Sequence, residues 1–81
     1  MSRNKSYVIL IDEGYGVGVE VWTGEKKAKK RAKELFENKI KAYGEENYTD
    51  IERDIENDKY KAYDSDNNHI KIELISVFNK I

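Results

Sequence analysis

Three glycines follow the first apolar segment and resemble a phosphate-binding loop. Gly14, Gly16 and Gly18 come directly after Tyr7–Ile11. Their spacing is G-x-G-x-G and the next segment alternates like a strand, whereas a dinucleotide fingerprint needs G-x-G-x-x-G at the start of a helix. We therefore interpret the glycines as turn residues of a β-hairpin rather than as a phosphate site.

A polar cluster near the end of the chain has the residue types of a calcium-binding loop. Asp64, Asp66 and Asn68 alternate, but His69 stands where such a loop needs glycine and Ile75 where it needs a bidentate glutamate. The pattern favours an Asx-rich turn. His69 with nearby Ser65 could pair as base and nucleophile, yet nothing in the sequence orients them or supplies an oxyanion hole, so we interpret the histidine as a solvent-exposed loop residue. We expect no catalytic residue, no metal, no cofactor and no enzymatic activity.

Two oppositely charged segments offer binding chemistry instead. Residues 1–44 hold ten Lys and Arg against six Asp and Glu, whereas residues 45–81 hold five against ten. In the first segment, a helix would place four lysines along one face: Lys26, Lys29, Lys30 and Lys33. These cations could contact phosphates, or they could only keep the helix soluble. The acidic residues of the second segment could form a partner-binding face that mimics a phosphate backbone, or they could be an ordinary solvated face. These residues are Glu45, Glu46, Asp50, Glu52, Asp54 and Glu56.

The element that positions these charges is a long amphipathic helix, predicted over Glu25–Tyr43. One stripe at helical spacing is apolar: Ala28, Ala32, Leu35, Phe36, Ile40 and Tyr43. Thr23 is the expected N-cap, and Gly44 the expected C-terminal stop. The capping-box spacing Thr49-Asp50-Ile51-Glu52 predicts a second, short acidic helix.

The remaining segments predict two hairpins. Tyr7–Ile11 and Val17–Trp22 form the first, and Tyr60–Tyr63 and Ile70–Leu74, the latter continuing to Phe78, form the second. The expected fold is α+β: one domain over residues 1–81, with order β-β-α-α-β-β and a four-stranded, mainly antiparallel sheet packed by the long helix on one face.

The sheet is expected to leave one face open. We expect Val17, Val19 and Val21, with Ile70, Ile72 and Leu74, to face the helix. The opposite side would then carry a large apolar and aromatic surface, which usually marks an interface: Tyr7, Ile9, Ile11, Trp22, Tyr63, Ile75 and Val77. A partner protein, or a second copy in a homodimer, is implied. Aromatic side chains dominate interface hot spots, so the predicted anchors are Trp22, Tyr48, Tyr60 and Tyr63.

Composition and the length of the apolar segments indicate the cellular compartment of the protein. The 81 residues contain neither cysteine nor proline, and the net charge is −1. Tyr7–Ile11 is too short for a signal-peptide core or a membrane span, so we expect a soluble cytoplasmic protein without membrane contact.

The Tyr-rich, Lys-rich pattern with an acidic segment and no Cys or Pro resembles small accessory proteins of phages and mobile elements in AT-rich bacteria. In size and charge segregation it is similar to anti-CRISPR and other anti-defence proteins, a resemblance of composition and element order that carries no family motif. It implies a non-enzymatic inhibitor that binds and blocks a host defence protein, such as a nucleic-acid-binding effector. The alternatives are a nucleic-acid-binding or nucleotide-sequestering module that uses the basic helix face, and a homodimeric structural protein.

Overall fold

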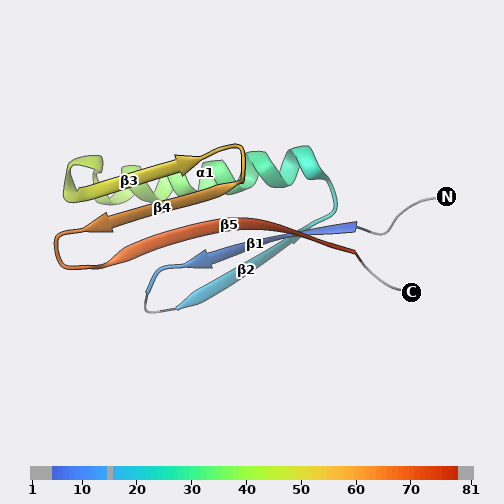
Figure 1. Cartoon of the computed structure of the whole chain (residues 1–81), viewed down its shortest axis with the longest axis horizontal. Helices are drawn as coiled ribbons and strands as arrows, with labels where there is room; N and C mark the ends of the chain where they lie inside the picture. The colour runs from blue at the N-terminus through green and yellow to red at the C-terminus, as the bar shows by residue number, and fades with distance from the viewer. Residues whose placement is uncertain (1–4, 15, 79–81) are drawn as a thin grey trace.

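The computed structural model describes residues 5–14 and 16–78 as one helix packed on a five-stranded sheet (Figure 1). The elements follow the chain in this order: β1 (Lys5–Asp12), β2 (Val17–Trp22), α1 (Glu25–Tyr43), a single 3-10 turn η1 (Glu45–Asn47), β3 (Tyr48–Asp54), β4 (Lys59–Asp64) and β5 (His69–Phe78). The α+β class is confirmed. Among the described residues, no helix is long and apolar enough to cross a membrane.

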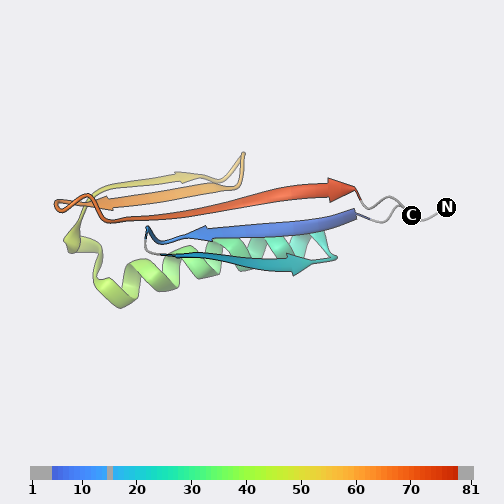
Figure 2. The same cartoon turned by 90° about the horizontal axis from the view of Figure 1, so that it is seen from below.

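The five strands lie in the order β2-β1-β5-β4-β3, and every pair is antiparallel. The predicted hairpins β1–β2 and β4–β5 are both present. They are joined by the pairing of β1 with β5, the first strand with the last, which lie side by side along their length (Figure 2). Because β1 and β5 are both central, β2 and β3 form the two edges of the sheet.

Helix α1 has the predicted bounds. Gly24, rather than Thr23, is its N-cap, and no side chain caps this end, so the expectation for Thr23 is wrong. Gly44 ends the helix as predicted: its φ of 95° is accessible to glycine without a Cβ clash, and its N–H donates to the carbonyl of Ile40.

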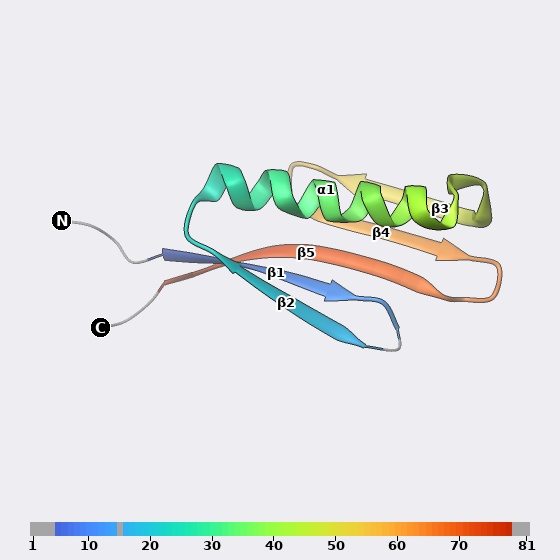
Figure 3. The same cartoon turned by 180° about the vertical axis from the view of Figure 1, so that it is seen from behind.

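The apolar stripe of α1 packs on one face of the sheet. Four side chains of α1 are buried: Ala28, Ala32, Phe36 and Ile40. The last three form one hydrophobic core with the buried strand residues Ile9, Tyr60, Ala62, Ile70 and Ile72. The ring centroids of Phe36 and Tyr60 are 5.3 Å apart. The helix lies behind β3 and β4 in Figure 1 and in front of them in Figure 3, the view from the opposite side. No described element covers the other face of the sheet.

The predicted acidic helix is wrong, because its residues form η1 and the edge strand β3. Tyr48 and Ile51 are three residues apart, a helical spacing, yet both pack against the core. A register shift between Tyr48 and Asp50 makes this possible in a strand, because the extra residue of a bulge restores the inward direction. The hydroxyl of Thr49 donates to the carbonyl of Tyr63 instead of capping a helix. The sheet therefore has five strands, and the order is β-β-α-β-β-β.

The predicted orientation of β1 and β2 is also wrong. Tyr7 and Ile9 are buried on the helix side, whereas Val17, Val19 and Val21 are 69%, 57% and 64% exposed. Residues opposite each other in an antiparallel pair share a face, and Ile9 pairs with Glu20 and Tyr7 with Trp22. The alternation of residues along a strand divides its side chains between the two faces of the sheet, but it does not show which face the helix covers. The helix-facing positions of Ile70 and Ile72 in β5 are confirmed.

A pair of alanine substitutions tests this orientation. We expect Ile9→Ala to lower the free energy of unfolding by about 2–5 kcal/mol, because it leaves a cavity at a fully buried position. Val19→Ala should change it by less than about 0.5 kcal/mol, as exposed substitutions do. Urea unfolding at pH 7 measures both, and a larger loss for Val19→Ala than for Ile9→Ala would reverse the assignment of faces.

Candidate binding surface

The uncovered face of the sheet has an apolar half formed by β2, β1 and the second half of β5. Val8 lies between Val21 and Ile75 in the register, and Leu10 lies between Val19 and Glu73, which borders the apolar residues. Ile75 and Val77 are 38% and 42% exposed. We call this set the apolar half-face: Val8, Leu10, Val17, Val19, Val21, Ile75 and Val77. It is a contiguous apolar surface of the kind that usually marks an interface.

The edge of this half is formed by β2, which pairs only with β1 among the described strands. Exposed edges are normally protected by charged side chains, proline or a bulge, because their free N–H and C=O groups accept another strand. The side chains that β2 directs to the uncovered face are all valines, and its one charged residue, Glu20, points to the helix side, where Arg31 binds it. The edge is therefore open to pairing.

The other half of the uncovered face is charged. Asp50, Glu52 and Asp54 of β3 lie opposite Tyr63, Lys61 and Lys59 of β4. Lys59 also forms a 3.5 Å ion pair with Glu73 of β5. The row of carboxylates on β3, opposite the lysines of β4, protects this edge from pairing with another strand, whereas β2 has no charged side chain on this face.

The six predicted acidic residues do not share one face. Asp50, Glu52 and Asp54 lie on the uncovered face of β3, Glu45 and Glu46 lie in η1, and Glu56 lies in the turn after β3. All six are exposed. The strand spacing of the three β3 carboxylates replaces the helical spacing that the mimicry hypothesis assumes.

The predicted aromatic anchors lie in three different environments. Tyr60 is 2% exposed and packs on Phe36, so the expectation that it is an exposed anchor is wrong. Trp22 and Tyr48 are half-buried and pack against the core from the helix side. Tyr63 is half-buried on the uncovered face, with its ring 6.2 Å from that of His69. The structure does not gather these four residues into one patch.

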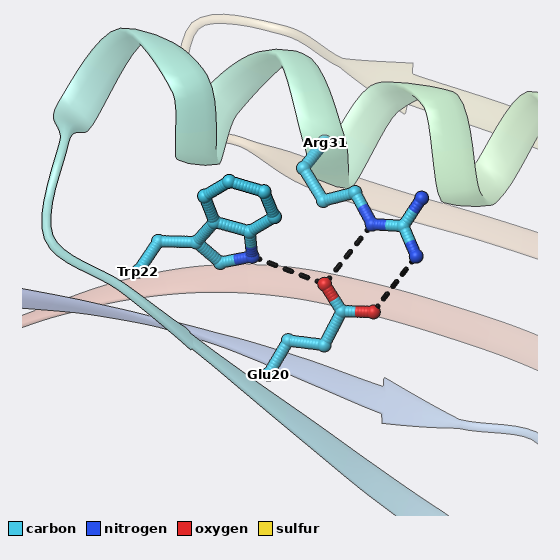
Figure 4. A network of polar contacts seen from close by, with 3 residues as sticks. All are labelled: Glu20, Trp22 and Arg31. Atoms are coloured by element: carbon cyan, nitrogen blue, oxygen red, sulfur yellow. Dashed lines mark hydrogen bonds and ion pairs between the residues drawn. The ribbon is translucent and has the colours of Figure 1, made fainter.

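Trp22 belongs to a polar network that ties β2 to the helix (Figure 4). Its indole N–H donates to Oε1 of Glu20 at 3.0 Å, and Arg31 donates to both Glu20 oxygens, each at 3.0 Å. The hydrogen bonds from Arg31, and then that from Trp22, lower the pKa of Glu20 below its ordinary value.

The predicted basic face lies on the solvent side of α1. Lys26, Lys29, Lys30 and Lys33 are all exposed. Lys29 approaches Asp58 to 3.8 Å, whereas Lys26, Lys30 and Lys33 form no ion pair with any described residue. The β3 carboxylates on the uncovered face therefore do not neutralise the basic face of the helix.

The smaller polar motifs have structural roles. Asp64 Oδ1 accepts the N–H groups of Asp66 and Asn68, which confirms the Asx-rich turn. Gly14, with a φ of 87°, lies in the β1–β2 turn. The next residue, Tyr15, is outside the described residues.

His69 begins β5 with 26% of its side chain exposed, so the interpretation of this histidine as a solvent-exposed loop residue is wrong. Its Nε2 lies 3.4 Å from Oδ1 of Asp12, and no hydrogen bond joins it to Ser65 among the described residues. Among the described residues, no group of His, Asp and Glu is arranged to hold a metal ion.

Sequence reasoning missed a cavity of about 370 Å³ at the end of the sheet where α1 ends. Its walls include Tyr43, Asn47 and Tyr48 around the end of the helix, and Asp64 and Asn68 in the β4–β5 turn. These residues are separated in the chain by up to 25 positions, so no local spacing signals the cavity. The exposed valines were visible in the sequence, but their face was assigned incorrectly.

No protein-family model, curated protein or solved structure matches this chain.

Substitution of Glu20 tests the network at β2. The folded-state pKa of Glu20 is lowered, so its ionised form stabilises the fold above about pH 4.5, the ordinary value, and this contribution disappears as the pH falls through the lowered pKa. We expect Glu20→Gln to cost up to about 1 kcal/mol at pH 7, because the ion pair is partly exposed.

Urea unfolding of both proteins from pH 7 to pH 2.5 measures the effect, and the difference should shrink toward acid. Glu56→Gln, a substitution in an exposed turn, is the matched control and should follow the wild type. A difference between wild type and Glu20→Gln that stays constant with pH would contradict the assignment.

Proposed function

We propose that this chain is a non-enzymatic binding protein that binds another protein through the apolar half-face. The observation that carries the proposal is the exposure of Val17, Val19 and Val21 on an edge strand without a charged side chain on that face. Fully burying a valine contributes about 1.5–3 kcal/mol, so covering three half-exposed valines would contribute roughly 3 kcal/mol. That free energy corresponds to an affinity about a hundredfold higher. Hydrogen bonds between β2 and a strand of the partner would add to it.

The narrower proposal is that the partner is a host defence protein of the CRISPR type and that binding blocks it. Size, composition and segregation of charge, which resemble those of anti-defence proteins of phages and mobile elements, support it. The charged half of the same face, with Asp50, Glu52 and Asp54, would then lie at the rim of the interface, where charges increase the association rate and select the partner.

A lysine substitution on the apolar half-face tests both levels of this proposal. We expect Val19→Lys to fold normally, because the position is 57% exposed, and to weaken partner binding at least about tenfold, because a charge would be buried in an apolar contact. Ala42→Lys, which adds the same charge at an exposed position on the solvent side of α1, is the matched control.

The three proteins would be expressed in bacteria that carry a CRISPR-type defence, and phage plating efficiency would be measured together with capture of the defence effector. Wild type and Ala42→Lys should restore plating and capture the effector, and Val19→Lys should do neither. Failure of the wild type to do either would overturn the host-defence proposal. Equal activity of all three would overturn the assignment to the apolar half-face. Sedimentation over a range of protein concentrations identifies a homodimer, the alternative occupant of this surface.

A second candidate function is nucleic-acid binding by the basic face of α1. It is favoured by the exposure of Lys26, Lys30 and Lys33 and by the lack of ion pairs between them and the described residues. Phosphate contacts would make the affinity fall steeply with salt. Under this alternative, the double substitution Lys30→Glu and Lys33→Glu should abolish retention of duplex or single-stranded DNA at 50 mM salt, whereas Val19→Lys should not. Absence of retention by the wild type would exclude the alternative.

A further inference from the structure

The cavity at the end of the sheet is separate from the apolar half-face. It has a volume of about 370 Å³, within the range of small-ligand sites, and lies among the end of α1, the residue after β1 and the β4–β5 turn. None of its lining residues belongs to the apolar half-face. An inference about this cavity therefore does not depend on the proposed function.

The polar groups of the cavity mostly accept hydrogen bonds. Asn47 donates its side-chain N–H to the carbonyl of Tyr43, and Asn68 donates its own to Oδ2 of Asp64 at 3.1 Å. An amide can reach a carbonyl or carboxylate oxygen only with its nitrogen, so both amide orientations are determined. Each amide has a donor engaged within the protein, while its oxygen accepts no hydrogen bond from a described residue.

The charges of the cavity favour a cation. Glu13 is bound through Oε1 by Lys39 at 2.5 Å, which leaves Oε2 without a hydrogen bond from a described residue. Asp64 accepts three hydrogen bonds but forms no ion pair with any described residue. Burial raises the pKa of the Tyr48 hydroxyl, and Tyr43, Asp64 and Glu13 raise it further, as a negative local potential requires.

Two tyrosine rings, together with His69 and Ile70, complete the lining. Tyr43 is 56% exposed although the other residues of the helix stripe are buried or half-buried, and Tyr48 is half-buried beside it in the cavity wall. The faces of tyrosine rings attract cations, with the strongest effect where water is partly excluded. Free acceptor oxygens, an unpaired carboxylate and tyrosine rings together suit a cation that carries several N–H donors.

We propose that this cavity binds a guanidinium or primary ammonium group. Its two sources are an arginine or lysine side chain of a partner protein and a free polyamine. Both offer the positive charge and the N–H donors that the lining accepts, and the fork of a guanidinium could reach two acceptors at once.

Titration followed by NMR, with three probes, tests the proposal: N-acetyl-arginine amide, N-acetyl-citrulline amide and spermidine. Citrulline has nearly the shape of arginine without its charge. We expect the arginine probe or spermidine to bind at least about tenfold more tightly than the citrulline probe, with shifts concentrated at Tyr43, Tyr48 and Asn68. Preference for the arginine probe indicates a side chain as the source, and preference for spermidine a free polyamine. Equal binding of all three, or no binding, would overturn the proposal.

Variants of the lining make the test specific. Tyr43→Ala should weaken binding of the preferred cation about fivefold, the value of roughly 1 kcal/mol for a cation–aromatic contact, and Tyr43→Phe should restore it. Glu13→Gln should also weaken binding. Glu34→Gln, which removes the same charge at an exposed helix position outside this cavity, should not. Circular dichroism checks that each variant folds, and the same affinity for every variant would contradict binding in this cavity.

Discussion

The docking of one helix on one face of the sheet determines the rest of this structure. A single helix supplies a single apolar stripe, and in α1 that stripe has four fully or nearly fully buried residues. It can cover one face of a sheet but not both. Once Ile9 and Tyr60 are on the covered side, alternation forces the valines of β2 to the other side. The exposed apolar half-face is thus a consequence of packing rather than an independent feature.

Charged side chains along α1 hold the helix over both edges of the sheet. Arg31 reaches Glu20 of the edge strand β2, and Arg53 of the opposite edge strand β3 donates to both carboxylate oxygens of Glu37, at 2.7 and 3.0 Å. The guanidinium of Arg53 also lies 5.9 Å from the ring centre of Phe36, at the border of the core. Each pair is partly exposed and contributes little stability alone. Together they specify the position of the helix, because a shifted helix would lose both bidentate contacts.

The sequence predicted those parts of the fold that depend on local patterns. The helix bounds follow from the period of its stripe and from Gly44, and the two hairpins follow from alternation and turn residues. The third strand could not be predicted in this way. Thr49-Asp50-Ile51-Glu52 has the spacing of a capping box, and the bulge near Thr49 gives the inward-facing Tyr48 and Ile51 a helical spacing as well. The covered face of β1 and β2 depends on tertiary packing: Glu20 is acceptable under the helix only because Arg31 and Trp22 satisfy it. The cavity gathers residues from distant parts of the chain, so it has no local signal at all.

The accessibility of single cysteines tests most directly which face of β1 and β2 the helix covers. The natural chain has none, so Val19→Cys and Ile9→Cys each provide one reporter. We would measure their rates of reaction with a thiol reagent in native buffer and compare each with its rate in denaturant. Because the helix covers Ile9 and leaves Val19 exposed, Val19→Cys should react nearly as fast in the folded as in the unfolded protein, and Ile9→Cys should react far more slowly when folded. A protected Val19→Cys and a reactive Ile9→Cys would place the helix on the other face of β1 and β2 and remove the basis of the proposed binding surface.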